Sequence, residues 1–300
     1  MNWKLKAAAQ FAFAHLPYGE RINHLAQIAN GSFRPATQLR ELLIQADYVR
    51  RLDARFRIAG RTILEIGPGW QGVGSITLAL FGAQHIYAFD HQPHLRLPLM
   101  QQLLDIAARH IGELSQASGL ARDMLESRLR RFRAPTLPAL LGALHITYVA
   151  PGDAAKTGLA AASVDMIYSY GVLEHIQDRV LDAIMAETVR VLKPGGRACH
   201  NIGLHDHFHN AGLGNGVNFL RYPEWKWAFF CHNKILFHNR LRLPHYLEMF
   251  RRHGLKVAWM DRQLLDINLA ALKEIQVDRK FSGLSAEDLA ASHLYVDLVH

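Results

Sequence analysis

The sequence predicts an α/β fold built on a doubly wound sheet, and three observations support this. Residues 61–67 form a short apolar run that ends in glycine, which indicates a buried strand and a tight turn. Residues 75–81 then read as a helix, and residues 85–90 as a second strand. Strand, glycine turn, helix and strand in this order open a doubly wound sheet.

The composition favours one catalytic domain that carries insertions. The chain has 300 residues, of which 50% are hydrophobic and 20% are charged, enough to bury a core without metals or disulfides. No linker rich in proline, glycine or serine divides it. Its two cysteines, Cys199 and Cys231, show no paired spacing, which predicts a reducing compartment such as the cytoplasm.

Residues 1–60 are predicted to form an N-terminal helical extension of a domain that spans residues 61–300. Residues 36–49 place apolar side chains at helical spacing. Residues 7–16 are apolar but fall short of the roughly 18 residues that cross a bilayer, so we expect a helix there. Packing on its own domain is the simpler expectation for this helix, and peripheral contact with a membrane surface is the alternative.

The later elements alternate as in an α/β sheet. Residues 91–144 are long for one crossover and carry two helical patterns followed by Pro135 and Pro138, which indicates an enlarged helical insertion. A second insertion is expected over residues 203–254. The expected helices cover 179–192, which a Lys-Pro-Gly-Gly turn ends, and 244–253. The expected strands cover 144–149, 164–169, 197–202, 255–259 and 294–299.

The strongest local signal is the segment Glu65-Ile-Gly-Pro-Gly-Trp-Gln-Gly72, followed by Asp90 at the end of the second strand. Glycines let the backbone approach a ligand closely, and the next helix presents its N-terminus to that ligand. An acid at the position of Asp90 can accept hydrogen bonds from both ribose hydroxyls. The pattern alone suits NAD as well as any other adenosine ligand.

Glu65 helps to separate these ligands. A carboxylate two residues before the first glycine would repel a pyrophosphate. S-adenosylmethionine lacks a pyrophosphate and carries a cationic sulfonium and an ammonium group. The sequence therefore favours the methyl donor over NAD.

With these residues in place, the chain resembles the class I S-adenosylmethionine-dependent methyltransferases that have small-molecule acceptors, of methyltransferase type 11. Five motifs follow in that family's order, over residues 63–69, 87–90, 152–154, 163–176 and 190–196. The resemblance implies a Rossmann-like sheet of seven mostly parallel strands whose last strand is antiparallel. It also implies S-adenosylmethionine as the cofactor.

The resemblance implies seven donor contacts. They are Glu65, Gly67, Gly69, Asp90, Asp153, Ser169 and Gly171. By this resemblance Asp153 reaches the adenine amino group. The chain departs from the family pattern here, because Ala-Ala-Lys follows Asp153 where an acidic, proline-bearing segment is usual.

Three histidines are predicted to act on the acceptor, namely His175, His205 and His207. His175 directly follows the fourth strand, at the edge of the sheet where ligands bind, although a histidine that caps the turn is the structural alternative. Asp206 would add an oxygen ligand to a metal, but side chains of an extended stretch alternate in direction. We therefore predict no metal site and one histidine that acts as a base.

The acceptor is predicted to be a small molecule or a lipid- or glycan-type compound, and the charge favours an anionic one. The formal net charge is +8, and Arg122–Arg133 is rich in arginine. Arg240 and Arg242 precede a helix, and arginine forks suit phosphate or carboxylate. The aromatic stretch of residues 219–230 is expected to be packed core, with a lid or a membrane-facing surface as alternatives. The oligomeric state stays open.

Three rival functions remain. A nicotinamide-dependent oxidoreductase shares the glycines and Asp90 but leaves Glu65 unexplained. A nucleic-acid methyltransferase suits the basic charge, but Ser169-Tyr-Gly-Val172 stands where many base-modifying relatives carry Asn/Asp-Pro-Pro-aromatic, so nucleic acid is not predicted as a partner. The third is a non-catalytic module that binds the donor.

Overall fold

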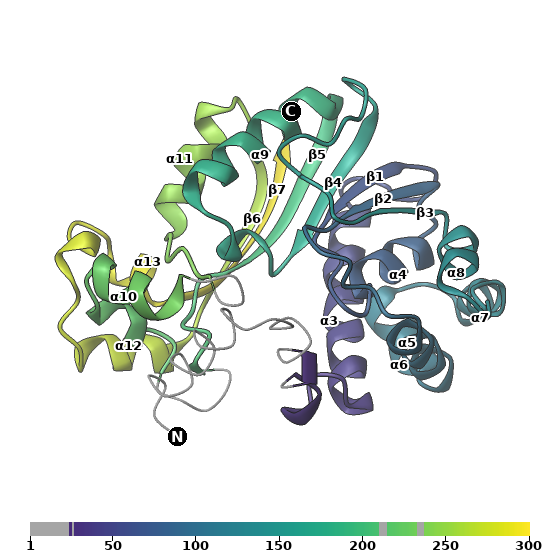
Figure 1. Cartoon of the computed structure of the whole chain (residues 1–300), viewed down its shortest axis with the longest axis horizontal. Coiled ribbons are helices and arrows are strands. Elements are labelled where there is room, and N and C mark those ends of the chain that lie inside the picture. The colour runs from purple at the N-terminus through teal and green to yellow at the C-terminus, as the bar shows by residue number, and fades with distance from the viewer. Residues whose placement is uncertain (1–23, 26, 210–214, 233–236) are drawn as a thin grey trace. The chain divides into compact units, whose positions relative to one another are not determined.

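A computed structural model describes residues 24–25, 27–209, 215–232 and 237–300 of the chain (Figure 1). The chain divides into two compact units. The glycine-loop unit comprises Gln27–Tyr170, Ala186–Cys199 and Asp297–His300. The histidine unit includes Gly171–Met185 and His200–Val296.

Seven strands form one sheet in the order β3-β2-β1-β4-β5-β7-β6, which confirms the predicted seven-stranded α/β fold. The strands are β1 (Thr62–Ile66), β2 (His85–Phe89), β3 (Ile146–Val149), β4 (Val164–Tyr170), β5 (Leu192–Gly203), β6 (Lys256–Leu264) and β7 (Ala291–Val299). β1 pairs in parallel with β2 and β4, and β2 pairs in parallel with β3. All of β4 but its last residue is buried, as expected for a parallel strand covered on both faces.

The last strand runs antiparallel to β5, as predicted. The N–H of His300 donates to the carbonyl of Gly196, and the N–H of Leu204 donates to the carbonyl of Ser292. Residue numbers therefore rise along one strand as they fall along the other. β5 begins at Leu192 and not at Arg197 as expected, because the predicted turn keeps pairing: the Gly195 N–H donates to the His300 carbonyl.

The N-terminal extension is helical where the structure describes it. α3 (Pro35–Asp53) confirms the helix expected over residues 36–49. Its face with Leu42, Tyr48 and Val49 is buried. It packs against helices α4 (Val73–Leu80), α5 (Leu97–Arg109) and α6 (Ile111–Ser118). The helix expected over residues 7–16 lies outside the described residues.

The crossover between β2 and β3 is helical, as predicted, but it holds four helices where the sequence indicated two. Figure 1 shows them beside β1, β2 and β3. Pro138, which follows the two helical patterns, lies in the first turn of α8 (Leu137–Ala143), where its missing N–H costs nothing. The helices between β1 and β4 are α4 (Val73–Leu80), α5 (Leu97–Arg109), α6 (Ile111–Ser118), α7 (Arg122–Arg131) and α8 (Leu137–Ala143).

Helices later in the chain were predicted less completely. α9 (Asp178–Val191) and α11 (Leu243–Arg252) confirm the helices expected over 179–192 and 244–253. The shorter elements were not predicted from periodicity; they are η1 (Leu173–His175), η3 (Asn218–Arg221), α10 (Glu224–Cys231), α12 (Asp266–Lys273), η4 (Arg279–Phe281) and α13 (Ala286–Ala290). Among the described residues, no helix combines the length and apolar character needed to cross a membrane.

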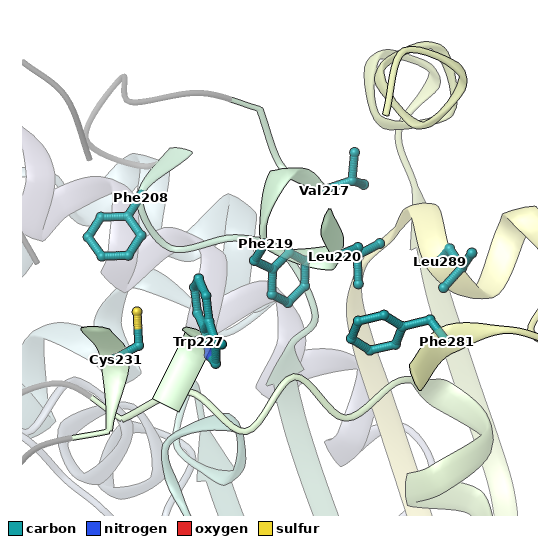
Figure 2. Packing of buried hydrophobic residues seen from close by; sticks show 8 residues of the cluster. All are labelled: Phe208, Val217, Phe219, Leu220, Trp227, Cys231, Phe281 and Leu289. Atoms are coloured by element: carbon teal, nitrogen blue, oxygen red, sulfur yellow. The ribbon is translucent and has the colours of Figure 1, made fainter. Parts of the chain in front are cut away.

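The aromatic stretch divides between core and surface. Phe219 and Trp227 are buried in a cluster with Phe208 and Phe281 (Figure 2), and the Phe219 and Trp227 ring centroids lie 5.9 Å apart. On the same helix α10, however, Trp225 is 74% exposed. The packed-core prediction is therefore correct for Phe219 and Trp227 and wrong for Trp225.

Candidate functional site

The glycine turn after β1 adopts backbone conformations that favour glycine. Gly67, Gly69 and Gly72 have φ values of 73°, 65° and 61°. The Gly67 N–H donates to the carbonyl of Phe89 at 2.8 Å, which joins the turn to the end of β2. A methyl group at Gly69 would meet no atom within 4 Å, so space lies open beside this glycine. α4 follows Gly72 directly, and this glycine has no side chain with which to cap the helix N-terminus.

Glu65 lies at 3% exposure on β1 and contacts the first turn of α4. Its carboxylate accepts hydrogen bonds from the hydroxyl and the backbone N–H of Ser75. A methyl group at Gly74 would overlap the Glu65 carboxylate. Burial raises the pKa of Glu65 to about 7, and the hydrogen bonds from Ser75 offset only part of that rise. Sequence reasoning missed Gly74 and Ser75, although they extend the glycine pattern past Gly72.

Asp90 follows β2 and is buried. Its Oδ1 lies 3.1 Å from Nδ1 of both His91 and His94. Burial raises the pKa of this carboxyl, but the two histidines outweigh burial and bring the pKa to about 2. Asp90 is therefore ionised at neutral pH and can accept hydrogen bonds. Sequence reasoning missed both histidines, although His91 directly follows the acid and His94 lies four residues after it.

The position of Asp90 is fixed through β3. Its N–H donates to the carbonyl of Val149 at 3.1 Å, and its carbonyl accepts from the N–H of Gly152 at 2.8 Å. Gly152 cannot carry a side chain, because a methyl group there would lie 2.6 Å from the Val149 carbonyl oxygen. The neighbouring Asp153 is exposed, and its Oδ1 accepts from the N–H of Ala155 at 2.8 Å.

Six of the seven predicted donor residues belong to the glycine-loop unit. Since β3, β2, β1 and β4 are neighbouring parallel strands, their carboxyl ends meet at one edge of the sheet, where ligands of such sheets bind. The residues at that edge are Glu65, Gly67, Gly69, Asp90, Asp153 and the fully buried Ser169. Gly171 belongs to the histidine unit, and its N–H donates to the carbonyl of Asn201 at 3.0 Å.

These residues fit an adenosine ligand with a cationic end. The open space at Gly69 gives room against the backbone, and the ionised Asp90 suits a pair of hydroxyl groups. Glu65 adds a second acid to the same edge, which disfavours a pyrophosphate.

The three predicted catalytic histidines lie together in the histidine unit. The ring centroids of His175 and His207 are 4.8 Å apart, and those of His205 and His207 are 5.1 Å apart. Two further histidines join them: His238 stacks on His207 at 4.4 Å, and His293 lies 4.9 Å from His205. We call these five residues the histidine cluster. No local sequence pattern predicted His238 or His293, because only the tertiary structure places them beside His205 and His207.

The hydrogen bonds around His175 fix its tautomer. Nδ1 lies 2.7 Å from the carbonyl oxygen of Phe237, which can only accept, so Nδ1 donates and Nε2 keeps its lone pair when the ring is neutral. Burial holds the pKa of His207 and of His238 well below the usual range, so both rings are neutral at physiological pH.

Glu174, which precedes His175, is a further member of this site that sequence reasoning missed. Its side chain is buried, and burial raises its pKa. Oε1 accepts from the N–H of Gly203 at 2.9 Å, whereas Oε2 is buried and has no hydrogen-bond partner among the described residues. The Nδ2 of Asn239 donates to the carbonyls of Leu173 and Ile176, which holds the turn in place.

Asp206, by contrast, does not join the histidines. Its Oδ1 accepts from the N–H of Phe208 at 2.9 Å, and it belongs to no group of candidate metal ligands among the described residues. Asp206 therefore points away from His205 and His207, as expected for neighbouring side chains that alternate in direction.

A cavity of about 740 Å³ lies in the histidine unit. Its described lining residues are Gln177, Asp178, Arg179, Glu224, His232, Phe237, Asn239 and Lys280. The cavity borders the Glu174–His175 turn, since Phe237 and Asn239 both bond to that turn. Arg179 is exposed and forms no hydrogen bond or ion pair with the described residues, while Lys280 pairs with Glu224.

Arg240 and Arg242 do not provide the anion site that their spacing suggested. Both guanidinium groups are buried. Arg240 donates to two carbonyls and pairs with Glu224. Arg242 donates to the carbonyls of Leu204, Asp288, Leu289 and Ala291. The two arginines therefore hold loops in place through backbone carbonyls. The prediction that they bind an anionic acceptor was wrong, because the sequence does not distinguish an exposed arginine from a buried one.

Residues 117–200 match a family model described as a methyltransferase domain. Comparison with curated protein sequences gives no match.

Solved structures give three similarities of interest. An S-adenosylmethionine-dependent methyltransferase from Mesorhizobium loti is 15% identical, with a TM-score of 0.47, over 86% of this chain and 100% of that chain. A methyltransferase of Haloferax volcanii, in complex with the Trm112 activator, is 18% identical, with a TM-score of 0.46, over 84% and 88%. Geranyl diphosphate C-methyltransferase from Streptomyces coelicolor is 14% identical, with a TM-score of 0.43, over 80% and 73%.

Proposed function

We propose that this chain is an S-adenosylmethionine-dependent methyltransferase that transfers the methyl group to a small acceptor with an anionic group; the match of residues 117–200 to a methyltransferase domain supports the activity. The observation that supports the anionic group is the cavity beside the Glu174–His175 turn, because Arg179 lines it and leaves its guanidinium group without a partner among the described residues. A phosphorylated lipid headgroup or an acidic glycan precursor would carry such a group.

The donor side is assigned to the edge of the glycine-loop unit. S-adenosylmethionine supplies a methyl group on a sulfonium that leaves readily. Gly67 and Gly69 let the backbone approach the ligand, Glu65 and Asp90 place carboxylates beside it, and Asp153 and Ser169 complete this edge. We propose Gly171 as the seventh residue that contacts the donor.

The acceptor side is assigned to the histidine cluster, with His175, His205 and His207 as the residues that activate the acceptor. Near neutral pH, an oxygen or nitrogen nucleophile must lose its proton or have its O–H or N–H bond weakened. Neutral imidazoles provide lone pairs that accept this proton. Positioning and exclusion of water supply the remaining rate enhancement.

The test is an assay of S-adenosylhomocysteine release over a panel in which each compound is present in a phosphorylated and an unphosphorylated form, such as phosphoethanolamine and ethanolamine. We expect turnover with phosphorylated members alone. Arg179→Ala should raise KM for them more than about tenfold, as expected for the loss of a charge-assisted hydrogen bond. The control is Arg251→Ala, because Arg251 is exposed and paired with Glu248. A preference for the neutral members, or an unchanged KM in Arg179→Ala, would contradict the anionic acceptor.

A further inference from the structure

We propose that Glu174, His175 and His207 form a binding site for one divalent transition-metal ion. One candidate ligand atom from each residue lies within 4.8 Å of those from the other two. The three side chains come from two segments, since Glu174 and His175 follow β4 whereas His207 follows β5.

The donor set selects the class of metal. Two imidazole nitrogens with one carboxylate oxygen suit Zn²⁺, Fe²⁺ and Co²⁺, whereas Mg²⁺ and Ca²⁺ prefer oxygen ligands alone. Ligands bound at about 2.1 Å lie roughly 3 to 3.5 Å from their neighbours around the metal. The observed limit of 4.8 Å leaves a gap that small rotations of the side chains close.

Glu174 supplies the independent observation that points to a cation. A buried carboxylate oxygen without a partner costs free energy, and Oε2 of Glu174 is such an atom among the described residues. A bound cation would provide the missing partner. Oε1 stays held by the N–H of Gly203, so the carboxylate presents one oxygen and not two.

Gly203 lies beside both Glu174 and His207. A methyl group on this glycine would lie 2.5 Å from Oε1 of Glu174 and 3.1 Å from Nε2 of His207. Both atoms therefore approach the same backbone position, and any larger residue would fill the space beside them.

Neighbouring groups hold His175 and His207 in position, as is usual for histidines that bind a metal. The second ring nitrogen of a ligating histidine commonly donates to a carbonyl, and Nδ1 of His175 does so to Phe237. His207 is packed in place by His238, whose ring stacks on it at an interplanar angle of 18°. His238 in turn stacks on Phe219, with centroids 5.3 Å apart. His238 is thus a positioning residue.

Three protein ligands leave coordination positions free, which is typical of catalytic and not of structural metal sites. A metal there would occupy the lone pairs of His175 and His207, so His205 would remain as the base. The metal would weaken the O–H or N–H bond of the acceptor by drawing charge from it, so that the proton leaves more easily. This role rests on the proposed function, whereas metal binding itself does not.

A second group, Asp90, His91 and His94, has the same ligand types. Its ligand atoms already bond to one another, with Nδ1 of each histidine 3.1 Å from Oδ1 of Asp90. The proposal therefore places the metal at Glu174, and the double variant H91A/H94A separates the two sites.

The experiment titrates the full chain with Zn²⁺ and with Co²⁺ after chelator treatment, in the absence of any donor or acceptor. We expect one equivalent to bind and the Co²⁺ form to show visible absorption bands. His175→Ala and Glu174→Gln should each weaken binding more than about tenfold. His110 is a partly exposed histidine that pairs with Glu113, and His110→Ala and H91A/H94A should both bind the metal as the unaltered chain does.

Absence of stoichiometric binding by the folded chain, or loss of binding in H91A/H94A with retention in both His175→Ala and Glu174→Gln, would overturn the proposal. Circular dichroism establishes that each variant is folded before titration. Because no donor is present, failure of the metal site is distinct from failure of methyl-donor binding, which a separate titration measures.

Discussion

Glu65 is the residue whose chemistry depends most on burial. Its pKa rises from its usual value near 4.5 to about 7, so the folded state holds a proton there that the unfolded chain releases. The stabilising contribution is complete below pH 4.5 and is lost as the pH rises through about 7. The loss amounts to roughly 3 kcal/mol for the chain without ligand.

Denaturant titrations between pH 5 and 9 test this expectation for Glu65. The free energy of unfolding of the unaltered chain should fall across that range. Glu65→Gln cannot ionise at this position, so its free energy of unfolding should fall by roughly 3 kcal/mol less. Identical pH profiles for the two proteins would show that Glu65 does not titrate in this window.

Asp90 is expected to contribute affinity for the donor. Asp90→Asn removes an ionised acceptor from the end of β2 and should weaken S-adenosylmethionine binding by about 10- to 100-fold, as loss of hydrogen bonds to a charged group does. Asp105→Asn is the matched control, because that acid forms an ion pair with Arg133 at the surface. Calorimetric affinities for the three proteins decide the point, and equal values would remove Asp90 from the donor site.

The histidine cluster should affect turnover and not donor affinity. His205→Ala and His207→Ala should each lower kcat by about 100-fold or more, in the range of general acid–base catalysis, with the donor Kd changed less than about threefold. Unchanged turnover in both variants would take these residues out of the reaction.

At the scale of elements, contact between β1 and α4 depends on Gly74. Gly74→Ala would place a methyl group against the Glu65 carboxylate, force β1 and α4 apart and weaken donor binding. The matched control is Gly142→Ala in α8, where a methyl group meets no atom within 4 Å and alanine should stabilise the helix by about 0.5 to 1 kcal/mol. Thermal unfolding of both variants should therefore give shifts of opposite sign, and a stable Gly74→Ala variant would contradict this packing.

The elements also show where sequence reasoning succeeds. The strands around the glycine turn were predicted within two residues, because apolar runs ending in glycine or aspartate are local signals. Glu174 and His238 were missed because their surroundings come from distant segments. Arg240 and Arg242 were misassigned for the same reason, since only tertiary structure reveals the carbonyls that they bind.

For the whole molecule, the net charge of +8 is weaker evidence for an anionic partner than it first appeared. The guanidinium groups of Arg242 and Arg128 bind backbone carbonyls, and that of Arg240 forms an ion pair with the partly exposed Glu224. What remains specific is the position of Arg179 beside the cavity, so the anionic acceptor depends on that residue and not on overall charge.

The whole account depends on the carboxylates and glycines of the glycine-loop unit binding an adenosyl sulfonium. Isothermal titration calorimetry of the full chain with S-adenosylmethionine, S-adenosylhomocysteine and NAD⁺ tests this most directly. We predict one site for each of the first two ligands and no heat with NAD⁺. A well-folded chain that takes up neither S-adenosyl compound, or that binds NAD⁺ more tightly, would contradict it.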